Sequence, residues 1–491
     1  MAFVETLPRG MFIDGRDVGG GGLTATPVHD PATGEVVGTA LEGGAAEIDA
    51  AVASATAAFA RWSRMPASAR GELMHAAAAA VLSELDALAQ LLTLEQGKPI
   101  REATLELQRF VHTVDHYAGM SKNLRGGYVP NLDHDAHGLI LRRPLGVVGA
   151  IVPWNFPTTL LANKFGPALV TGNTLVAKPA ETTPLTTLRI AQIFSTAGLP
   201  PGVFNVVTGL GAEAGEALVR HPGVAKIAFT GSTRVGRHVM AAAAETTKRI
   251  TLELGGSDPM IVCEDANVDA AVKAATVGRF FNCGQACLAV KRLFVYEAVY
   301  DEFVEKLLAR TGRLRIGPGS DPATLLGPVH SDRQRRVVEE QVAEALDGGA
   351  ELLHGGKRPE GESFDAGFFY EPTLLLEAAR DSRVATEEVF GPALPIWRVG
   401  DFDEAIDRAN ESVYGLGSSI FTRDLNAANS AAERLNAGYT WINSPQRPYD
   451  ELPFGGVGQS GFGREHGIEA LDHYTETKSV VVRRADVETE R

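Results

Sequence analysis

The sequence predicts an α/β protein with parallel β-sheet and at least two domains. Its 491 residues are about three times the length of an average domain. Short apolar segments that end at Gly or Pro alternate with stretches of helical spacing, which is the pattern of βαβ units. The pattern runs through the first half of the chain and resumes after about residue 255, so we expect a second α/β lobe there.

The elements outside these repeats are predicted from composition and spacing. Residues 1–45 are rich in Gly, Pro and turn-forming residues, with a flexible tip at residues 19–22. Residues 46–120 are rich in Ala, Leu and Glu at helical spacing and predict helices. The segment HGLILRRP (137–144) predicts an extended strand before the first sheet, and TKSVVVRR in the C-terminal tail predicts another.

Within the lobes, buried strands and helices are expected in alternation. The strands of the first lobe are GVVGAIVP (146–153), NTLVAKP (173–179), VFNVVTG (203–209) and KIAFTG (226–231). Helices between them include TTLRIAQIFSTAG (186–198) and AEAGEALVRH (212–221). The second lobe includes TLELGGSDPMIVC (251–263), KRLFVYEAVYDEFVEKLLAR (291–310) and GLGSSIFTR (415–423).

Charge and cysteine content exclude several classes of protein. A formal net charge of -15 argues against nucleic acid or an anionic membrane as the main partner. The chain contains no run of about 18 apolar residues, so no transmembrane helix is expected. Its N-terminus has no basic segment followed by an apolar one, so no signal peptide is expected. Three cysteines do not form a disulfide framework, and we expect a reducing compartment, the cytoplasm.

Two glycine-rich stretches approach the dinucleotide fingerprint G-x-G-x-x-G/A. GVGQSG (456–461) follows Pro453-Phe454 instead of an apolar strand and leaves only 30 residues after it, so a structural turn is the better interpretation. GLGAEA (209–214), which contains Gly211, follows a strand and opens a helix, but this pattern alone is a weak signal.

FTGSTRVG (229–236) is another candidate for contact with a phosphate. Gly231 permits close approach of the backbone. Ser232 either caps the following helix or donates to a phosphate at its positive end, and both interpretations stay open at this point.

The stretch FFNCGQACLAVKR (280–292) holds a candidate nucleophile, Cys287, where Gly284 leaves room for a substrate. A thioester formed there needs water activated by a base such as a carboxylate, for which Glu253 is a candidate. The C-x3-C spacing of Cys283 and Cys287 lacks further ligands nearby, so no metal site is expected. Taken alone, a cysteine is more often a small buried apolar residue than a nucleophile, and a glutamate such as Glu253 is more often an ion-pair partner than a base.

An ordered set of motifs changes that balance. Over nearly its full length the chain resembles the aldehyde dehydrogenase superfamily, and the separation of 34 positions from Glu253 to Cys287 is the family's own spacing. The motifs are PWNFP (153–157), KPAE (178–181), FTGSTRVG (229–236), LELGG (252–256), GQAC (284–287), EEVFGP (387–392) and PFGGVGQSGFGREHG (453–467).

The resemblance implies a role for each matching residue. Cys287 is the expected nucleophile, the Asn155 amide and the Cys287 backbone N–H form the oxyanion hole, and Glu253 activates the hydrolytic water. The residues expected to bind the cofactor are Trp154, Lys178, Glu181, Gly211, Gly231, Ser232, Leu254, Glu388 and Phe390. NAD is favoured over NADP, the alternative, because a carboxylate at Glu181 accepts from a ribose 2′-hydroxyl and repels a 2′-phosphate.

The resemblance also implies the domain plan. Residues 1–123 and 145–255 are expected to form a Rossmann-like NAD(P)-binding domain. Residues 256–474 are expected to form the catalytic domain, whose last part returns across the cofactor domain. Residues 124–144 and 475–491 form a small β extension for assembly into a homodimer or homotetramer.

The expected substrate is a small-molecule aldehyde, with an apolar or aromatic one favoured by Phe156 and Phe281. Relatives that prefer succinic semialdehyde carry arginine at the position of Phe281. Asn163 stands where many relatives carry tryptophan and is expected to open or polarise the pocket. Three alternatives stay open: a succinate-semialdehyde-type or other semialdehyde dehydrogenase, a CoA-acylating enzyme, which Glu253 disfavours, and a silent binding homologue.

Overall fold

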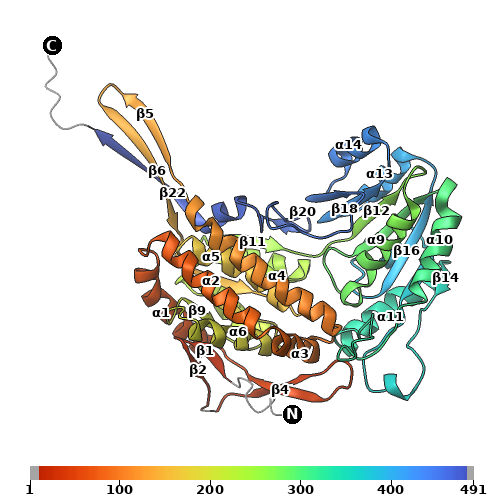
Figure 1. Ribbon diagram of the computed structural model, residues 1–491, viewed down its shortest axis with the longest axis horizontal. Coiled ribbons are helices and arrows are strands. Elements are labelled where there is room, and N and C mark those ends of the chain that lie inside the picture. The colour runs from red at the N-terminus through yellow and green to blue at the C-terminus, as the bar shows by residue number, and fades with distance from the viewer. Residues whose placement is uncertain (1–9, 21, 484–491) are drawn as a thin grey trace.

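The computed structural model describes residues 10–20 and 22–483 and contains two α/β lobes, with a β arm that projects from one of them (Figure 1). Three expectations concern residues outside the described ranges. They are the absence of a signal peptide at residues 1–9, the glycine tip at Gly21, and the part of the assembly extension at residues 484–491. The α/β fold class with parallel sheets is confirmed.

The first lobe is built on a mixed sheet with the strand order β2-β1-β9-β8-β7-β10-β11-β21. Its central strands β7 to β11 run parallel and are almost wholly buried, as their continuous apolar sequences predict. The strands are β1 (Met11–Ile13), β2 (Arg16–Val18), β7 (Val147–Ile151), β8 (Thr174–Lys178), β9 (Phe204–Val206), β10 (Val224–Thr230), β11 (Arg249–Glu253) and β21 (Gly461–Phe462).

Helices cover both faces of this sheet, and local sequence explains several of their ends. Glu47 accepts a hydrogen bond from the Gly44 backbone N–H at 2.8 Å before α1, and Gly97, with φ of 99°, ends α3 in the left-handed region. The helices are α1 (Ala45–Trp62), α2 (Ala67–Ser83), α3 (Leu85–Gln96), α4 (Ile100–Gly119), α5 (Pro157–Val170), α6 (Leu185–Thr196), α7 (Glu216–Arg220) and α8 (Thr233–Ala244), with a 3-10 turn at Met120–Asn123 and a π-helical turn at Gly211–Gly215.

The second lobe has the strand order β14-β15-β16-β13-β12-β18-β19, parallel except at β14. Its strands are β12 (Asp258–Val262), β13 (Val290–Tyr296), β14 (Glu351–His354), β15 (Thr373–Leu376), β16 (Ala393–Val399), β18 (Gly417–Phe421) and β19 (Tyr439–Ile442). Its helices are α9 (Val268–Phe280), α10 (Glu297–Thr311), α11 (Asp332–Asp347), α12 (Arg383–Thr386), α13 (Phe402–Asn410) and α14 (Leu425–Arg434), with 3-10 turns at Phe281–Gly284 and Glu362–Phe364. A further 3-10 turn at Glu469–Tyr474 packs against α5 and β11 of the first lobe.

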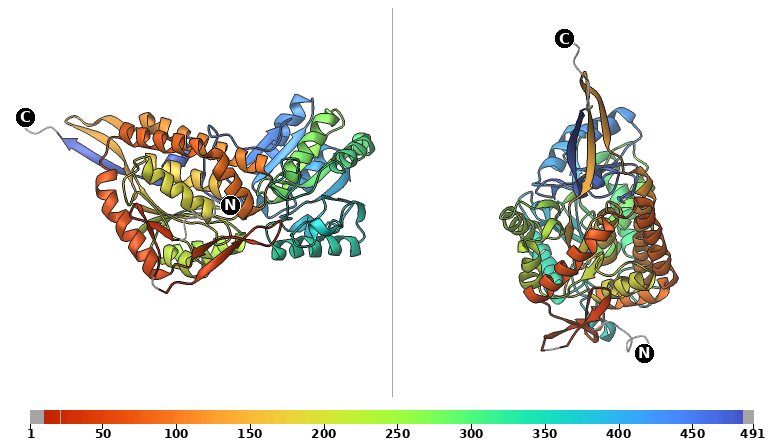
Figure 2. Two further views of the ribbon diagram at one scale, coloured as in Figure 1. Left: turned by 60° about the horizontal axis from the view of Figure 1, so that its bottom comes forward. Right: turned by 90° about the vertical axis from the view of Figure 1, so that its left-hand side faces the viewer.

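Three small β units complete the fold. A hairpin joins β3 (Ala25–His29) to β4 (Val36–Leu41), and β17 (Tyr414–Gly415) pairs with β20 (Val457–Gly458). The arm has the order β22-β6-β5 and consists of β5 (Gly127–Asp133), β6 (Ala136–Pro144) and β22 (Thr475–Arg483). Both views in Figure 2 show the arm extending away from the lobes.

The chain crosses from the second lobe back to the first near its C-terminal end. β21 pairs antiparallel with β11, so residues 461–462 extend the first sheet. The GVGQSG stretch is confirmed as a turn, because Gly458 and Gly461 have φ of 58° and 114° and a Cβ at Gly461 would collide with the Leu252 carbonyl oxygen. The exact domain boundaries stay a prediction.

Membrane crossing can be judged from helix length and apolarity. In residues 10–20 and 22–483, no single helix is long and apolar enough to cross a membrane. The pair α2 and α3, bent by 73°, meets the criterion on length and composition alone.

Candidate active site

A cavity of about 210 Å³ lies where the C-terminal ends of β7, β10 and β11 meet the second lobe. Ligands of open α/β sheets bind at this edge, because successive loops converge there. Eight of the predicted site residues line the cavity: Trp154, Asn155, Gly231, Ser232, Leu254, Cys287, Glu388 and Phe390. They come from five separate stretches of sequence, which the fold brings to one place.

Cys287 is held between the turn Phe281–Gly284 and strand β13. In that turn Asn282, Cys283 and Gly284 have φ of 49°, 55° and 72°, a left-handed run that is costly for the two non-glycine residues. Burial raises the pKa of the Cys287 thiol to about 12, and Lys291 acts against that rise. The thiol therefore needs further help to reach the thiolate form.

Asn155, directly after β7, is fixed by hydrogen bonds at both its side chain and its backbone. Its Nδ2 donates to the Gln285 carbonyl oxygen at 3.1 Å, two residues before Cys287. Its own carbonyl oxygen accepts from Lys98 Nζ at 2.8 Å and from Asn282 Nδ2 at 2.9 Å. The amide is thus fixed in orientation next to the nucleophile's loop.

A buried ion pair between Lys98 and Glu106 helps to hold the Asn155 backbone in place. Lys98 forms an ion pair with Glu106 on α4, and both side chains are at most 1% exposed. Glu106 Oε1 accepts from the Thr158 backbone N–H and hydroxyl, both at 2.9 Å, and so caps the N-terminus of α5. Helices α4 and α5 together therefore position the turn that carries Asn155.

Glu253 is the last residue of β11 and is 4% exposed. Neither carboxyl oxygen has a hydrogen-bond partner within the described part of the chain. Burial, followed by the nearby Glu465, raises the pKa of Glu253 well above its usual value. Glu465 is itself buried and accepts from Lys164 Nζ at 2.7 Å and Asn163 Nδ2 at 2.9 Å.

Glu388 and Lys291 form a second charged pair beside the nucleophile. Lys291 Nζ donates to Glu388 Oε1 at 2.8 Å and to the Cys287 carbonyl oxygen at 2.7 Å. The Gly256 backbone N–H donates to the same Glu388 oxygen at 3.1 Å. A Cβ at Gly255 would collide with Glu388, so this glycine leaves space for the carboxylate.

Arg279, wholly buried at the end of α9, joins the two loops that carry these residues. Its guanidinium donates to the carbonyl oxygens of Gly284 and Val389, each at 3.0 Å, to that of Val290 at 3.1 Å, and to that of Gly391. Burial lowers the pKa of Arg279 to about 9. One side chain thus holds the Cys287 loop against the Glu388 loop.

The aromatic rings of Trp154 and Phe390 line the cavity, and the ring of His330 packs against Trp154. Its indole stacks on His330 at 4.5 Å between centroids and 10° between planes, and meets the edge of Phe390 at 5.5 Å. Burial lowers the pKa of His330 to about 4, so its ring is neutral near pH 7. These contacts provide a flat, uncharged surface beside Cys287.

The remaining predicted cofactor residues lie at the ends of β8 and β9, along the same sheet edge. Lys178 is buried, with its Nζ 2.8 Å from the Pro179 carbonyl oxygen and 3.5 Å from Glu181 Oε2. The Glu181 side chain is 44% exposed. Gly211 opens the π-helical turn, and a Cβ there would meet open space.

Ser232 is the N-cap of α8, where its Oγ accepts from the Val235 backbone N–H at 3.4 Å. The capping interpretation is confirmed, and because Ser232 also lines the cavity, the N-terminus of α8 opens toward it.

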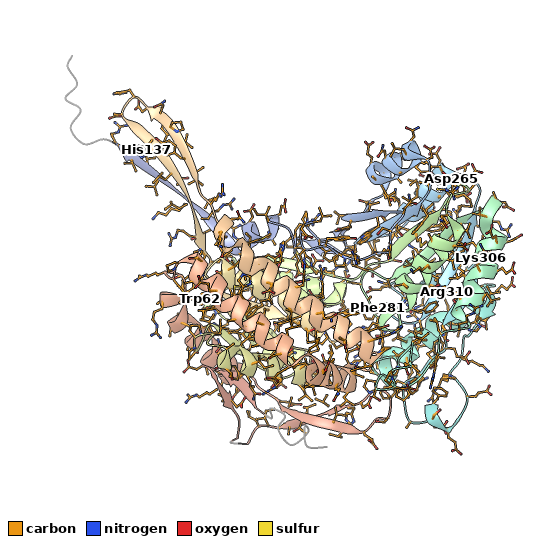
Figure 3. All side chains as sticks on the ribbon, in the orientation of Figure 1. Trp62, His137, Asp265, Phe281, Lys306 and Arg310 are labelled. Atoms are coloured by element: carbon orange, nitrogen blue, oxygen red, sulfur yellow. The ribbon has the colours of Figure 1, made fainter. Side chains whose placement is uncertain are left out.

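The predicted substrate residues are placed differently from one another. Phe156 and Phe281 stack with their rings 6.0 Å apart and 5° from parallel. Phe281 lies between the lobes, next to α10 with Lys306 and Arg310, and lines a second cavity of about 710 Å³ with them (Figure 3). Asn163 points to Glu465 and lines neither cavity.

Sequence reasoning missed several residues of the site. Lys291, Gln334 and Glu465 contact or line it, and Gln334 Nε2 donates to the Phe390 carbonyl oxygen at 2.9 Å. The one local signal that could have identified Lys291 is its place at the start of a strand whose later residues are apolar, because a buried ammonium needs a partner. Glu465 lies within the motif at 453–467 but had no role assigned to it, and no local signal pointed to Gln334.

Comparison with known proteins gives consistent matches along the whole chain. A family model described as the aldehyde dehydrogenase family matches residues 19–480. The chain is 42% identical over 462 residues to retinal dehydrogenase 2 of Homo sapiens, with 93% of this chain and 88% of that protein covered. It is 40% identical over 454 residues to the mitochondrial succinate-semialdehyde dehydrogenase of Arabidopsis thaliana, with 92% and 85% covered.

Solved structures match equally well. The crystal structure of betaine aldehyde dehydrogenase from Staphylococcus aureus in complex with NAD⁺ superposes with a TM-score of 0.95 at 35% sequence identity. The match covers 98% of this chain and 96% of that chain.

Proposed function

The chain belongs to the aldehyde dehydrogenase family, and on that premise we propose that it oxidises an aldehyde to the carboxylic acid with NAD as hydride acceptor, NADP being the alternative. The observation that carries the proposal is the cavity that joins Cys287 to Asn155, Glu388, Phe390 and the N-terminus of α8. A thiol and an amide donor are the groups that nucleophilic attack on an aldehyde requires at one place, and the N-terminus of a helix suits the phosphates of a dinucleotide.

In the proposed reaction Cys287 attacks the aldehyde carbon once its thiol has lost its proton. The oxygen of the resulting hemithioacetal accepts hydrogen bonds from Asn155 Nδ2 and the Cys287 backbone N–H, and the contact of Asn155 with Gln285 keeps that amide in place. When bound, the nicotinamide cofactor supplies the hydride acceptor that turns the hemithioacetal into a thioester.

Hydrolysis of the thioester is assigned to Glu253. A carboxyl group whose pKa is raised by burial is a stronger base when ionised, and can take a proton from water near neutral pH. The absence of hydrogen-bond partners for its two oxygens, within the described residues, leaves both available to water. This supports transfer of the acyl group to water over transfer to CoA.

The residues along the sheet edge fit a dinucleotide. Lys178 and the exposed carboxylate of Glu181 would hold the adenosine ribose, and Ser232 with the N-terminus of α8 would meet the pyrophosphate. Glu388, Phe390 and Trp154 would place the nicotinamide ribose and ring, with Gly211, Gly231 and Leu254 lining the path. An acidic group at the ribose favours NAD, because it repels the 2′-phosphate of NADP.

The proposed substrate is an aldehyde with an apolar or aromatic body. The stacked rings of Phe156 and Phe281 support this, because they offer an apolar surface within a few residues of Asn155 and Cys287. Arginine is absent from position 281, which lowers the case for a dicarboxylic semialdehyde.

A panel of aldehydes, tested with NAD and NADP in parallel and without CoA, tests the proposal by absorbance of the reduced nicotinamide. We expect reduction with at least one apolar or aromatic aldehyde and formation of the free acid. Product formation that depends on CoA would contradict hydrolysis, and no reduction across a broad panel would favour a silent binding homologue.

A further inference from the structure

Lys291 has an unusual place for a lysine. It is the second residue of the buried strand β13, its side chain is 0% exposed, and it comes four residues after Cys287. Its Nζ donates to the Cys287 carbonyl oxygen at 2.7 Å and to Glu388 Oε1 at 2.8 Å, and lies 5.8 Å from the centroid of the Phe390 ring. It therefore contacts the backbone of the nucleophile and also two residues of the proposed cofactor site.

The charged groups that face the Cys287 thiol come from four elements. They are Lys291 on β13, Asp258 on β12, Glu253 on β11 and Glu388 after α12. Burial raises the pKa of Asp258 to about 7, so this carboxyl group is only about half ionised at neutral pH, and burial also raises the pKa of Glu253 above its usual value. Lys291 is the cation of the set, and Glu388 forms an ion pair with it.

We propose that Lys291 is a positioning residue that presents a positive charge to the Cys287 thiol, and that Glu388 sets how much of this charge the thiol receives. While Glu388 is paired with Lys291, its negative charge offsets the ammonium. The proposed function gives Glu388 a second partner, the nicotinamide ribose, whose hydroxyl groups would share the negative charge of the carboxylate with Lys291. The inference rests on the proposed function for that second step alone.

The test is the rate of alkylation of Cys287 by iodoacetamide as a function of pH, in cofactor-free protein, with the modified peptide identified by mass spectrometry. Lys291→Met should shift the midpoint upward by about one unit, which lowers the rate at a fixed pH about tenfold. Lys291→Arg should restore most of the rate. Lys226→Met is the matched control, because Lys226 is equally buried but bonds to Thr251 on a strand of the first sheet, and it should leave the midpoint unchanged.

Glu388→Gln tests the second half of the proposal. Removal of the offsetting charge should increase the rate of alkylation when Lys291 is present. This increase should be several-fold larger than the increase that Glu388→Gln causes in protein that also carries Lys291→Met. Identical pH profiles for the wild type and Lys291→Met, in samples with native circular dichroism, would overturn the inference. Because alkylation needs no aldehyde, a shifted profile in a protein that oxidises no aldehyde would uphold Lys291 and refute the proposed function instead.

Discussion

The chemistry of the site depends on buried carboxyl groups that have few cations close enough to offset their negative charge. Glu253 and Glu465 influence each other, and Lys164 is the cation that pairs with Glu465. Two carboxyl groups in a low-dielectric site cannot both ionise easily, so Glu465 adds to burial in raising the pKa of Glu253. The arrangement keeps a proton acceptor of high affinity close to the nucleophile.

At the residue scale, Cys287→Ser should abolish aldehyde oxidation and preserve folding. The hydroxyl of serine is far less acidic than a thiol and has the same size, so the cavity keeps its form. Activity in the nicotinamide assay, with dinucleotide binding followed by fluorescence titration, measures both properties. Substantial turnover by the variant would refute the assignment of Cys287 as nucleophile.

Glu253→Gln should separate the two halves of the reaction. The amide is isosteric but cannot accept a proton from water, so we expect one equivalent of reduced nicotinamide per site in a rapid burst and then a stalled thioester. Stopped-flow absorbance resolves the burst, and mass spectrometry of the intact protein detects the acyl group. Steady turnover at the wild-type rate would remove Glu253 from the role of base.

At the scale of elements, two loops far apart in the sequence meet through one side chain. The loop before β13 carries Cys287, and the loop after α12 carries Glu388 and Phe390. Arg279 bonds to carbonyl oxygens of both loops and has no carboxylate ion pair among the described residues. Its hydrogen bonds satisfy backbone oxygens that would otherwise be buried without partners.

Arg279→Met should therefore lower both the stability of the protein and its affinity for the dinucleotide. Loss of the bonds to Gly284 and Val389 should lower the free energy of unfolding by about 3 kcal/mol and raise the KM for the dinucleotide more than the KM for the aldehyde. Urea unfolding and steady-state kinetics measure the two effects. Lys273→Met, an exposed change on the same helix, is the control and should stay within about 0.5 kcal/mol. Equal behaviour of the two variants would contradict this role.

At the scale of the whole molecule, the arm projects from the lobes and exposes apolar side chains to solvent. Its outer strands β5 and β22 are edges of a three-stranded sheet, and Tyr128, Leu132 and Val481 on them are 63%, 51% and 66% exposed. Apolar side chains on a projecting sheet edge favour pairing with another chain. We propose that residues 124–144 and 475–491 mediate assembly into a homodimer or homotetramer.

Val481→Lys should shift the protein toward a smaller species, because the lysine places a charge in the proposed contact. Light scattering coupled to size-exclusion chromatography gives the mass directly. Val36→Lys is a comparable change at a 56% exposed residue of the β3–β4 hairpin and should leave the mass unchanged. A wild-type protein that is monomeric at micromolar concentration would refute the assembly proposal.

The sequence by itself determined the α/β fold class, the central strands of the first lobe and the family. Periodicity and turn residues act over a few positions, so the strands after residues 146, 173, 203 and 226 could be predicted from their own composition. The ordered motifs likewise pointed to Cys287, Asn155 and Glu253, and the local context of the glycines at 456–461, after Pro453-Phe454, indicated a turn. These signals are local or are read in order along the chain.

Only the tertiary structure decided which distant side chains meet. Lys291 and Glu388 are 97 positions apart, Arg279 and Val389 are 110 apart, and Asn163 and Glu465 are 302 apart. No local pattern records such contacts, because they arise from packing of whole strands and helices. The same packing sets the burial of Glu253 and Cys287 and raises their pKa values, since burial depends on what covers a residue and not on its neighbours in the sequence.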